Sequence, residues 1–79
     1  MAPERAFAPV NIAILTVSDS RTIATDASGN VLADRIQTAG HRLAERKLVA
    51  DDIDAIVTAL RAWAADPGID VVITTGGTG

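Results

Sequence analysis

The sequence contains no cysteine, and only 3% of its residues are aromatic. Without thiols the chain has no disulfide, no thiolate zinc site and no cysteine nucleophile. A chain of 79 residues buries only about 60% of its unfolded surface on folding, so a single core of this size is marginally stable. The chain is therefore at most one small domain, and it lacks the cross-links that stabilise many small proteins.

A basic stripe and a long apolar run are also missing. Seven Lys and Arg residues are scattered among ten Asp and Glu residues, which gives a net charge of −3. This pattern disfavours nucleic acid or an anionic membrane as a partner, because both require clustered positive charge. No apolar run approaches the roughly 18 residues of a membrane span, and no signal peptide is evident. We expect a cytoplasmic protein.

Three apolar segments predict β-strands. Residues 10–17 form a nearly continuous run rich in β-branched residues, typical of a strand buried on both faces of a parallel sheet. Residues 69–74 have the same character, whereas residues 41–50 carry several charges and indicate an edge strand. Residues 1–9 contain two prolines and no periodicity, which predicts a flexible arm without chemistry.

Helical periodicity appears between these strands. Residues 29–39 place apolar side chains on one face, with Ser28 as the expected N-cap and Gly40 just past the end. A second helix is expected after Asp51, its N-cap, with Asp54 three residues later as the acidic partner. Its apolar face is predicted to comprise Ile53, Ile56, Val57, Leu60 and Ala64.

The alternation of strands and helices predicts an α/β fold. Right-handed crossovers between parallel strands place one helix on each connection and give three layers, α/β/α. The two apolar strands are expected to be neighbours, so the spatial strand order is second, first, third (2-1-3). Open sheets of this kind bind ligands at the carboxyl ends of adjacent central strands.

Small and polar residues follow both apolar strands at that edge. Residues 18–29 form a long polar connection after the first strand, and Thr75-Gly76-Gly77-Thr78-Gly79 follows the third. Glycines at such a place let backbone N–H groups approach an anion closely. Taken alone, the glycine stretch is equally consistent with an ordinary turn, and its spacing matches neither a Walker loop nor a dinucleotide fingerprint.

Several separated segments together resemble the molybdopterin-binding domain family, which includes molybdopterin adenylyltransferases. The resemblance extends over residues 11–79, which we expect to be the N-terminal half of a domain of ordinary size (10–79, after the arm). The segments that carry it are Ile14-Leu15-Thr16-Val17-Ser18-Asp19-Ser20-Arg21-Thr22, Asp26-Ala27-Ser28-Gly29, Ala39-Gly40-His41, Leu48-Val49-Ala50-Asp51-Asp52 and Thr74-Thr75-Gly76-Gly77-Thr78-Gly79.

This resemblance implies a role in molybdenum cofactor biosynthesis. Members bind molybdopterin, and adenylyltransferases among them use ATP and Mg²⁺ to place AMP on its terminal phosphate; trimers or hexamers are usual. Asp51 matches a carboxylate that those enzymes use near the substrate and is the expected catalytic residue. The positions that match the phosphate-binding or molybdopterin-binding part of the family are Ser18, Asp19, Ser28, Gly29, Thr75, Gly76, Gly77, Thr78 and Gly79.

The metal-holding acidic residue of the family falls after the glycine stretch, beyond Gly79, so no metal ligand is assigned here. We expect these residues alone to transfer no nucleotide. A non-catalytic pterin-binding or oligomeric scaffold of the same fold is the alternative function. A related domain of larger enzymes, such as molybdate-insertion or competence-damage-type proteins, is a second alternative, which the run Ser18-Asp19-Ser20 disfavours. An unrelated flavodoxin-like domain is the fallback for the fold class. Asp19 also has a structural interpretation, a turn within its own loop. We expect His41 to be exposed and Trp63 to pack in the core or an interface.

Overall fold

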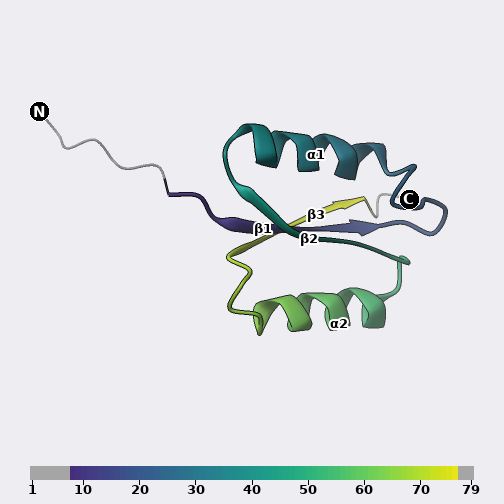
Figure 1. Cartoon of the computed structure of the whole chain (residues 1–79). Helices are drawn as coiled ribbons and strands as arrows, with labels where there is room; N and C mark the ends of the chain where they lie inside the picture. Colours follow the sequence, from purple (N-terminus) through teal and green to yellow (C-terminus); the bar gives the residue numbers. More distant parts are fainter. Residues whose placement is uncertain (1–7, 77–79) are drawn as a thin grey trace, which may run out of the picture.

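The computed structural model describes residues 8–76 and contains three parallel strands between two helical layers. Helix α1 covers one face of the sheet and α2 covers the other (Figure 1). The predicted α/β class, the three layers and the 2-1-3 strand order are confirmed. The elements are β1 (Asn11–Val17), α1 (Ala27–Thr38), β2 (Arg42–Val49), α2 (Ile53–Ala64) and β3 (Val71–Gly76).

Strand β1 is the centre of the molecule. It pairs in parallel with β2 on one side and β3 on the other, and residues 12–17 are all buried. Its alternating side chains supply two separate cores. One lies under α1 and includes Ile12, Ile14 and Ile36. The other lies under α2 and includes Ala13, Leu15, Val17, Ala59 and Trp63.

Helix α1 begins two residues earlier than the sequence pattern predicts. Its N-cap is Asp26, whose side chain accepts a hydrogen bond from the backbone N–H of Gly29, so the prediction of Ser28 as N-cap is wrong. The end is as expected. Gly40 has a φ of 89°, its N–H donates to the carbonyl of Gln37, and the N–H of His41 donates to that of Ile36. This pairing is a Schellman motif, which favours glycine at its left-handed position.

Helix α2 is capped by Asp52 rather than by Asp51. The Asp52 carboxylate accepts a hydrogen bond from the N–H of Ala55 at 3.0 Å, and Asp54 lies in the first turn. Of the expected apolar face, Ile56 and Leu60 pack against the core and Val57 is partly buried, whereas Ile53 and Ala64 are exposed. Ile53 is 77% exposed, while Ala59 and Trp63 are buried. Both helices thus use the aspartate immediately before their first residue as a cap, a position that strongly favours a short acidic side chain.

Strand β2 contains a register shift that reorients its charged side chains. Ile12 pairs with Leu43, but the next residue, Ala13, pairs with Glu45, so Ala44 is an extra residue without a partner. An extra residue reverses the faces of all later side chains in the strand. Glu45 therefore lies on the α2 side, where it accepts a hydrogen bond from Trp63 Nε1 at 2.8 Å.

Two smaller predictions have different outcomes. Trp63 packs in the core as expected, with 3% of its surface exposed. His41 is only half-buried rather than exposed, because its Nδ1 accepts a hydrogen bond from the backbone N–H of Val10 at 3.1 Å. Residues 1–7 of the predicted arm lie outside the described residues. Neither helix between residues 8 and 76 is long and apolar enough to cross a membrane.

Candidate functional site

The carboxyl ends of β1 and β3 meet the N-terminus of α1 at one edge of the sheet. Val17 and Gly76, the last residues of the two strands, pair with each other, and the connection from β1 returns to the sheet edge at Asp26. An open pocket of about 430 Å³ lies between the first turns of α1 and the end of β3. It is lined by Ala27, Ser28, Val31, Leu32 and Thr75.

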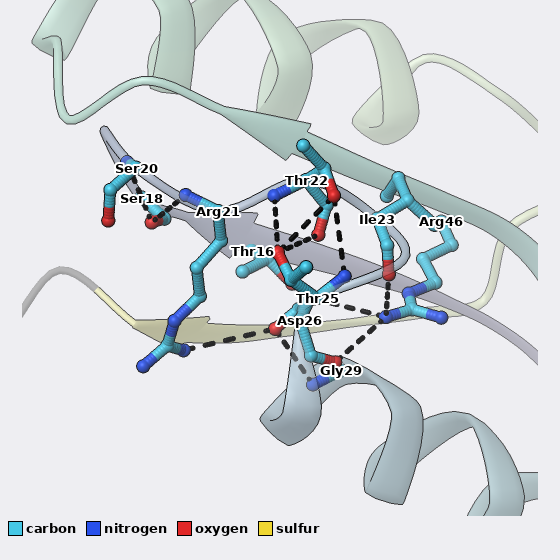
Figure 2. Close-up of polar contacts among 10 residues, drawn as sticks. All are labelled: Thr16, Ser18, Ser20, Arg21, Thr22, Ile23, Thr25, Asp26, Gly29 and Arg46. Atoms are coloured by element: carbon cyan, nitrogen blue, oxygen red, sulfur yellow. Dashed lines mark hydrogen bonds and ion pairs between the residues drawn. The ribbon is translucent and has the colours of Figure 1, made fainter.

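The carboxylate of Asp26 is the buried centre of this edge. None of its surface is exposed. Its Oδ2 accepts a hydrogen bond at 2.5 Å from the hydroxyl of Thr16 in β1, so the end of the loop between β1 and α1 is joined to the strand (Figure 2). Its Oδ1 accepts the cap hydrogen bond from the N–H of Gly29 at 3.1 Å. Both carboxylate oxygens are therefore bound to the protein rather than available to a ligand.

Arg46 of β2 compensates the charge of Asp26. Its Nη2 lies 3.2 Å from Asp26 Oδ2 and also donates to the backbone carbonyls of Asp26 and Ile23. The register shift in β2 makes this contact, because it places Arg46 beside Ile14 on the α1 side of the sheet. The side chain is 16% exposed. The guanidinium of Arg46 thus connects β2 to Ile23 in the loop after β1 and to Asp26, the N-cap of α1.

The surroundings of Asp26 keep its carboxyl ionised. Burial alone raises the pKa of the Asp26 carboxyl, because a low-dielectric environment disfavours the charge. The hydrogen bonds from Thr16 and Gly29 and the Arg46 guanidinium act in the opposite direction, and together they lower that pKa below its usual value. A buried carboxylate with this set of donors is a structural anion at neutral pH.

Gly29 has a structural role at this centre. A Cβ atom at this position would overlap Oδ2 of Asp26 and would lie 2.8 Å from Nη2 of Arg46. Its N–H, which we expected to meet a ligand, is already bonded to Asp26. The ion pair fits under α1 because residue 29 has no side chain.

The first turn of α1 presents other backbone donors to the pocket. Within residues 8–76, the N–H groups of Ala27 and Ser28 have no hydrogen-bond acceptor, as is usual for the first residues of a helix. Both residues line the pocket. A helix N-terminus with free N–H groups and a partial positive charge favours an anion. Ser28, one of the predicted site residues, therefore lines this pocket with a backbone N–H that has no acceptor among the described residues.

Ser18 and Asp19 organise the loops at this edge. The Ser18 hydroxyl accepts hydrogen bonds from the backbone N–H groups of Ser20 and Arg21, and so closes the turn after β1. Asp19 Oδ1 accepts from the N–H of Asp51 at 2.9 Å, which joins the connections that follow β1 and β2. The carboxylate of Asp19 therefore binds a backbone N–H in the loop between β2 and α2 rather than one in its own loop. Asp19 and Asp51, two of the predicted site residues, are neighbours at the surface.

Thr75 and Gly76 belong to β3 rather than to a loop after it. Thr75 pairs with Thr16, and Gly76 pairs with Val17. Gly76 has a φ of 88°, and a Cβ atom there would overlap the carbonyl oxygen of Val17. The close approach of the two strand ends thus requires glycine at this position. Gly77, Thr78 and Gly79 lie outside the described residues.

The described residues do not include a group of three or more His, Cys, Asp or Glu side chains placed to hold a metal ion. Two acidic residues at the surface, Asp19 and Asp51, are joined by the hydrogen bond from the Asp51 N–H to Asp19 Oδ1. Mg²⁺ is commonly held by one or two carboxylates together with phosphate oxygens of a ligand. A Mg²⁺ ion at Asp19 or Asp51 would therefore need phosphate oxygens of the ligand as further partners.

Four side chains of this site have roles that the sequence did not predict: Thr16, Arg21, Asp26 and Arg46. Thr16 is a hydroxyl within an otherwise aliphatic buried run, and a buried hydroxyl needs a polar partner. The hydroxyl of Thr16 could therefore have predicted a buried polar contact at the end of this strand. Arg46 was not predictable from periodicity, because the extra residue Ala44 changes the face on which it lies.

Comparisons with known proteins bear on these residues. The family model described as a probable molybdopterin binding domain matches residues 13–79. Molybdenum cofactor biosynthesis protein B of Escherichia coli (strain K12) is 44% identical over 73 residues, which are 92% of this chain and 43% of that protein. The protein of the same name from Bacillus cereus is 41% identical over 70 residues, which are 89% of this chain and 41% of that protein.

A solved structure shows the same fold. The crystal structure of a molybdenum cofactor biosynthesis protein B matches with a TM-score of 0.89 and 40% identity, and the match covers 95% of this chain and 47% of that chain. The chain therefore spans less than half the length of the relatives that it matches.

Proposed function

The chain belongs to the probable molybdopterin binding domain family, and from this membership we propose that it binds molybdopterin in molybdenum cofactor biosynthesis. The phosphate of the ligand would lie at the N-terminus of α1, in the pocket between Ser28 and Thr75. The observation that carries the proposal is the pair of unbonded N–H groups, those of Ala27 and Ser28, in that pocket.

Charge compensation at Asp26 supports an anionic ligand. An unpaired carboxylate at the helix cap would repel a phosphate a few ångströms away. Here Arg46 pairs with that carboxylate at 3.2 Å, so the partial positive charge of the helix N-terminus is not opposed by Asp26. The apolar side chains of Val31 and Leu32 in the same pocket suit the faces of a pterin ring.

Adenylylation of molybdopterin is the second candidate function. The observation that favours it is the hydrogen bond from the Asp51 N–H to Asp19 Oδ1, which joins two acidic residues in the loops that follow β1 and β2. In such a reaction ATP would supply the AMP group, and Mg²⁺ would neutralise the phosphates. For residues 1–79 alone we expect binding of molybdopterin without transfer of AMP to it.

The binding proposal is testable with matched proline variants. Ala27 is the first residue of α1, where proline removes the N–H yet fits the helix. The preceding Asp26 has a ψ of 84°, outside the α region that a following proline disfavours. Ile53→Pro is the matched control, because Ile53 is the first residue of α2 on the opposite face.

We expect wild-type protein and Ile53→Pro to bind molybdopterin equally in anoxic calorimetry. Ala27→Pro should bind about tenfold more weakly, since it loses one hydrogen bond to a charged group. Equal binding by all three proteins would contradict the proposed position of the phosphate, and no binding by the wild type would contradict the function. Pyrophosphate release after addition of ATP and Mg²⁺ would favour the adenylyltransferase alternative.

A further inference from the structure

Two arginines approach the buried carboxylate of Asp26. Arg46 lies 3.2 Å from Oδ2, and Arg21 Nη1 lies 4.0 Å from Oδ1. Figure 2 shows the two guanidinium groups on opposite sides of Asp26, one from β2 and one from the loop after β1. Asp26 therefore has two positively charged partners, while Asp19 and Asp51 belong to the neighbouring loops.

The two arginines are held very differently. Arg46 is largely buried and donates from Nη2 to three oxygens of Asp26 and Ile23. The side chain of Arg21 is 47% exposed, and among residues 8–76 its guanidinium makes a single polar contact, the ion pair at 4.0 Å. A half-exposed ion pair at that distance contributes little to stability. Asp26 is thus already neutralised by Arg46, and Arg21 is the surplus cation.

We propose that Arg21 is a ligand-contacting residue that leaves Asp26 and binds the phosphate of the ligand at the N-terminus of α1. This inference rests on the proposed function and assigns a side chain to the anion site that so far has only backbone donors. A guanidinium binds phosphate through two parallel charge-assisted hydrogen bonds, which an ammonium does not reproduce.

The backbone of the loop supports this role. The N–H of Arg21 donates to Ser18 Oγ at 3.1 Å, so residue 21 is fixed beside the end of β1 while its side chain remains half-exposed. Only the side chain has to move. Because Arg46 stays on Asp26, the buried carboxylate keeps a partner when Arg21 leaves it.

The opposing interpretation is that Arg21 is a second structural partner of Asp26. The two interpretations differ in their effect on stability and on the salt dependence of binding. A structural partner would lower the urea midpoint when it is removed. A ligand contact would leave that midpoint unchanged and would make phosphate binding weaker and less sensitive to KCl, because one screened charge is lost.

The experiment uses inorganic phosphate as the probe and the backbone amide signals of Ala27 and Ser28 as the readout by NMR. The variants are Arg21→Gln, Arg21→Lys and the control Arg61→Gln, an exposed arginine in the last turn of α2 with the same charge change. We expect Arg21→Gln to weaken phosphate binding about tenfold. Arg21→Lys should be intermediate, and Arg61→Gln should match the wild type.

Three results would overturn the inference. The first is equal phosphate binding by Arg21→Gln and Arg61→Gln. The second is a lowered urea midpoint in Arg21→Gln while the KCl dependence of its phosphate binding stays as in the wild type. The third is that phosphate shifts the amide signal of neither Ala27 nor Ser28 in the wild type. Failure of the proposed function is a separate result, because it is measured with molybdopterin on the wild type. If the wild type binds molybdopterin but the Arg21 variants bind phosphate as the wild type does, only this inference is contradicted. If phosphate binding depends on Arg21 but the wild type does not bind molybdopterin, only the proposed function is contradicted.

Discussion

The α-carbon of Gly29 faces the carboxylate of Asp26 so closely that a methyl group on Gly29 would overlap Oδ2. This close approach explains why residue 29 in the first turn of α1 is glycine, although helices generally favour alanine over glycine by about 1 kcal/mol. The buried ion pair between Asp26 and Arg46 occupies the space that a side chain would need.

The first prediction concerns this glycine. Gly29→Ala should lower the free energy of unfolding by about 1–3 kcal/mol, because the added methyl group displaces the buried ion pair. Asn30→Ala, an exposed neighbour in the same helix, should instead stabilise by a few tenths of a kcal/mol. Urea unfolding followed by the fluorescence of Trp63, the single tryptophan of the chain, measures both. Stabilisation by Gly29→Ala would contradict the close contact.

The second prediction concerns pH. The pKa of the Asp26 carboxyl is lowered in the folded protein, so its contribution to stability is fully present above the unfolded pKa of about 4 and is lost as pH falls through the folded pKa. Asp26→Asn should therefore be less stable than the wild type by about 3 kcal/mol at pH 7, since Arg46 loses its partner.

The stability difference between these two proteins should shrink below pH 4, as measured by urea unfolding from pH 7 to pH 3. Asp34→Asn, an exposed carboxylate in the middle of α1, serves as the control and should change stability little. A difference between Asp26→Asn and the wild type that stays constant down to pH 3 would show that the charge of Asp26 does not stabilise the fold.

The third prediction separates the hydroxyl of Thr16 from its methyl group. Thr16→Val keeps the shape but removes the donor to Asp26, so stability should fall by about 1–3 kcal/mol and the pKa of the Asp26 carboxyl should rise. Thr16→Ser keeps the donor, and the pKa of Asp26 should stay near its wild-type value. A carbon-13 NMR titration of the Asp26 carboxyl reads this directly, and the same titration curve for Val and Ser variants would refute the assignment.

The fourth prediction tests the register shift in β2. Deletion of Ala44 removes the extra residue, so Glu45 and Arg46 would exchange faces and leave Trp63 and Asp26 without their partners. We expect the deletion variant to be unfolded, as judged by the loss of dispersed amide signals. Ala44→Gly, which keeps the residue count, should fold with a modest loss of stability. A folded deletion variant with an intact Asp26 pair would show that the shift is dispensable.

Much of the fold follows from patterns in the sequence. The aliphatic run before Ser18 and the glycine at position 40 identify a buried strand and a helix end, because each depends on local chemistry. The helix starts were less certain. Both Asp51 and Asp52 are suitable caps, and only the geometry of the preceding loop, where Asp19 holds the N–H of Asp51, decides between them.

The site was harder to predict than the fold because its central contacts are long-range. Thr16, Asp26 and Arg46 come from a strand, a loop and a second strand, and their contact depends on an irregularity in the register of β2. Hydropathy describes Arg46 as part of an exposed edge. The family resemblance identified Ser28 and Gly29 as site positions, but the structure gives them different roles, one at the pocket and one beneath the buried ion pair.

The position of β1 in the middle of the sheet has a consequence for the order of events in folding. Its partners are distant along the chain, since Asn11 contacts Arg42 at a separation of 31 residues and Asp70 at a separation of 59. Neither pairing can begin as a local hairpin, and each must wait for an intervening helix to cross the sheet. We therefore expect closure of these long loops to limit the folding rate, and the amides of β1, which is paired on both sides, to be the last to exchange.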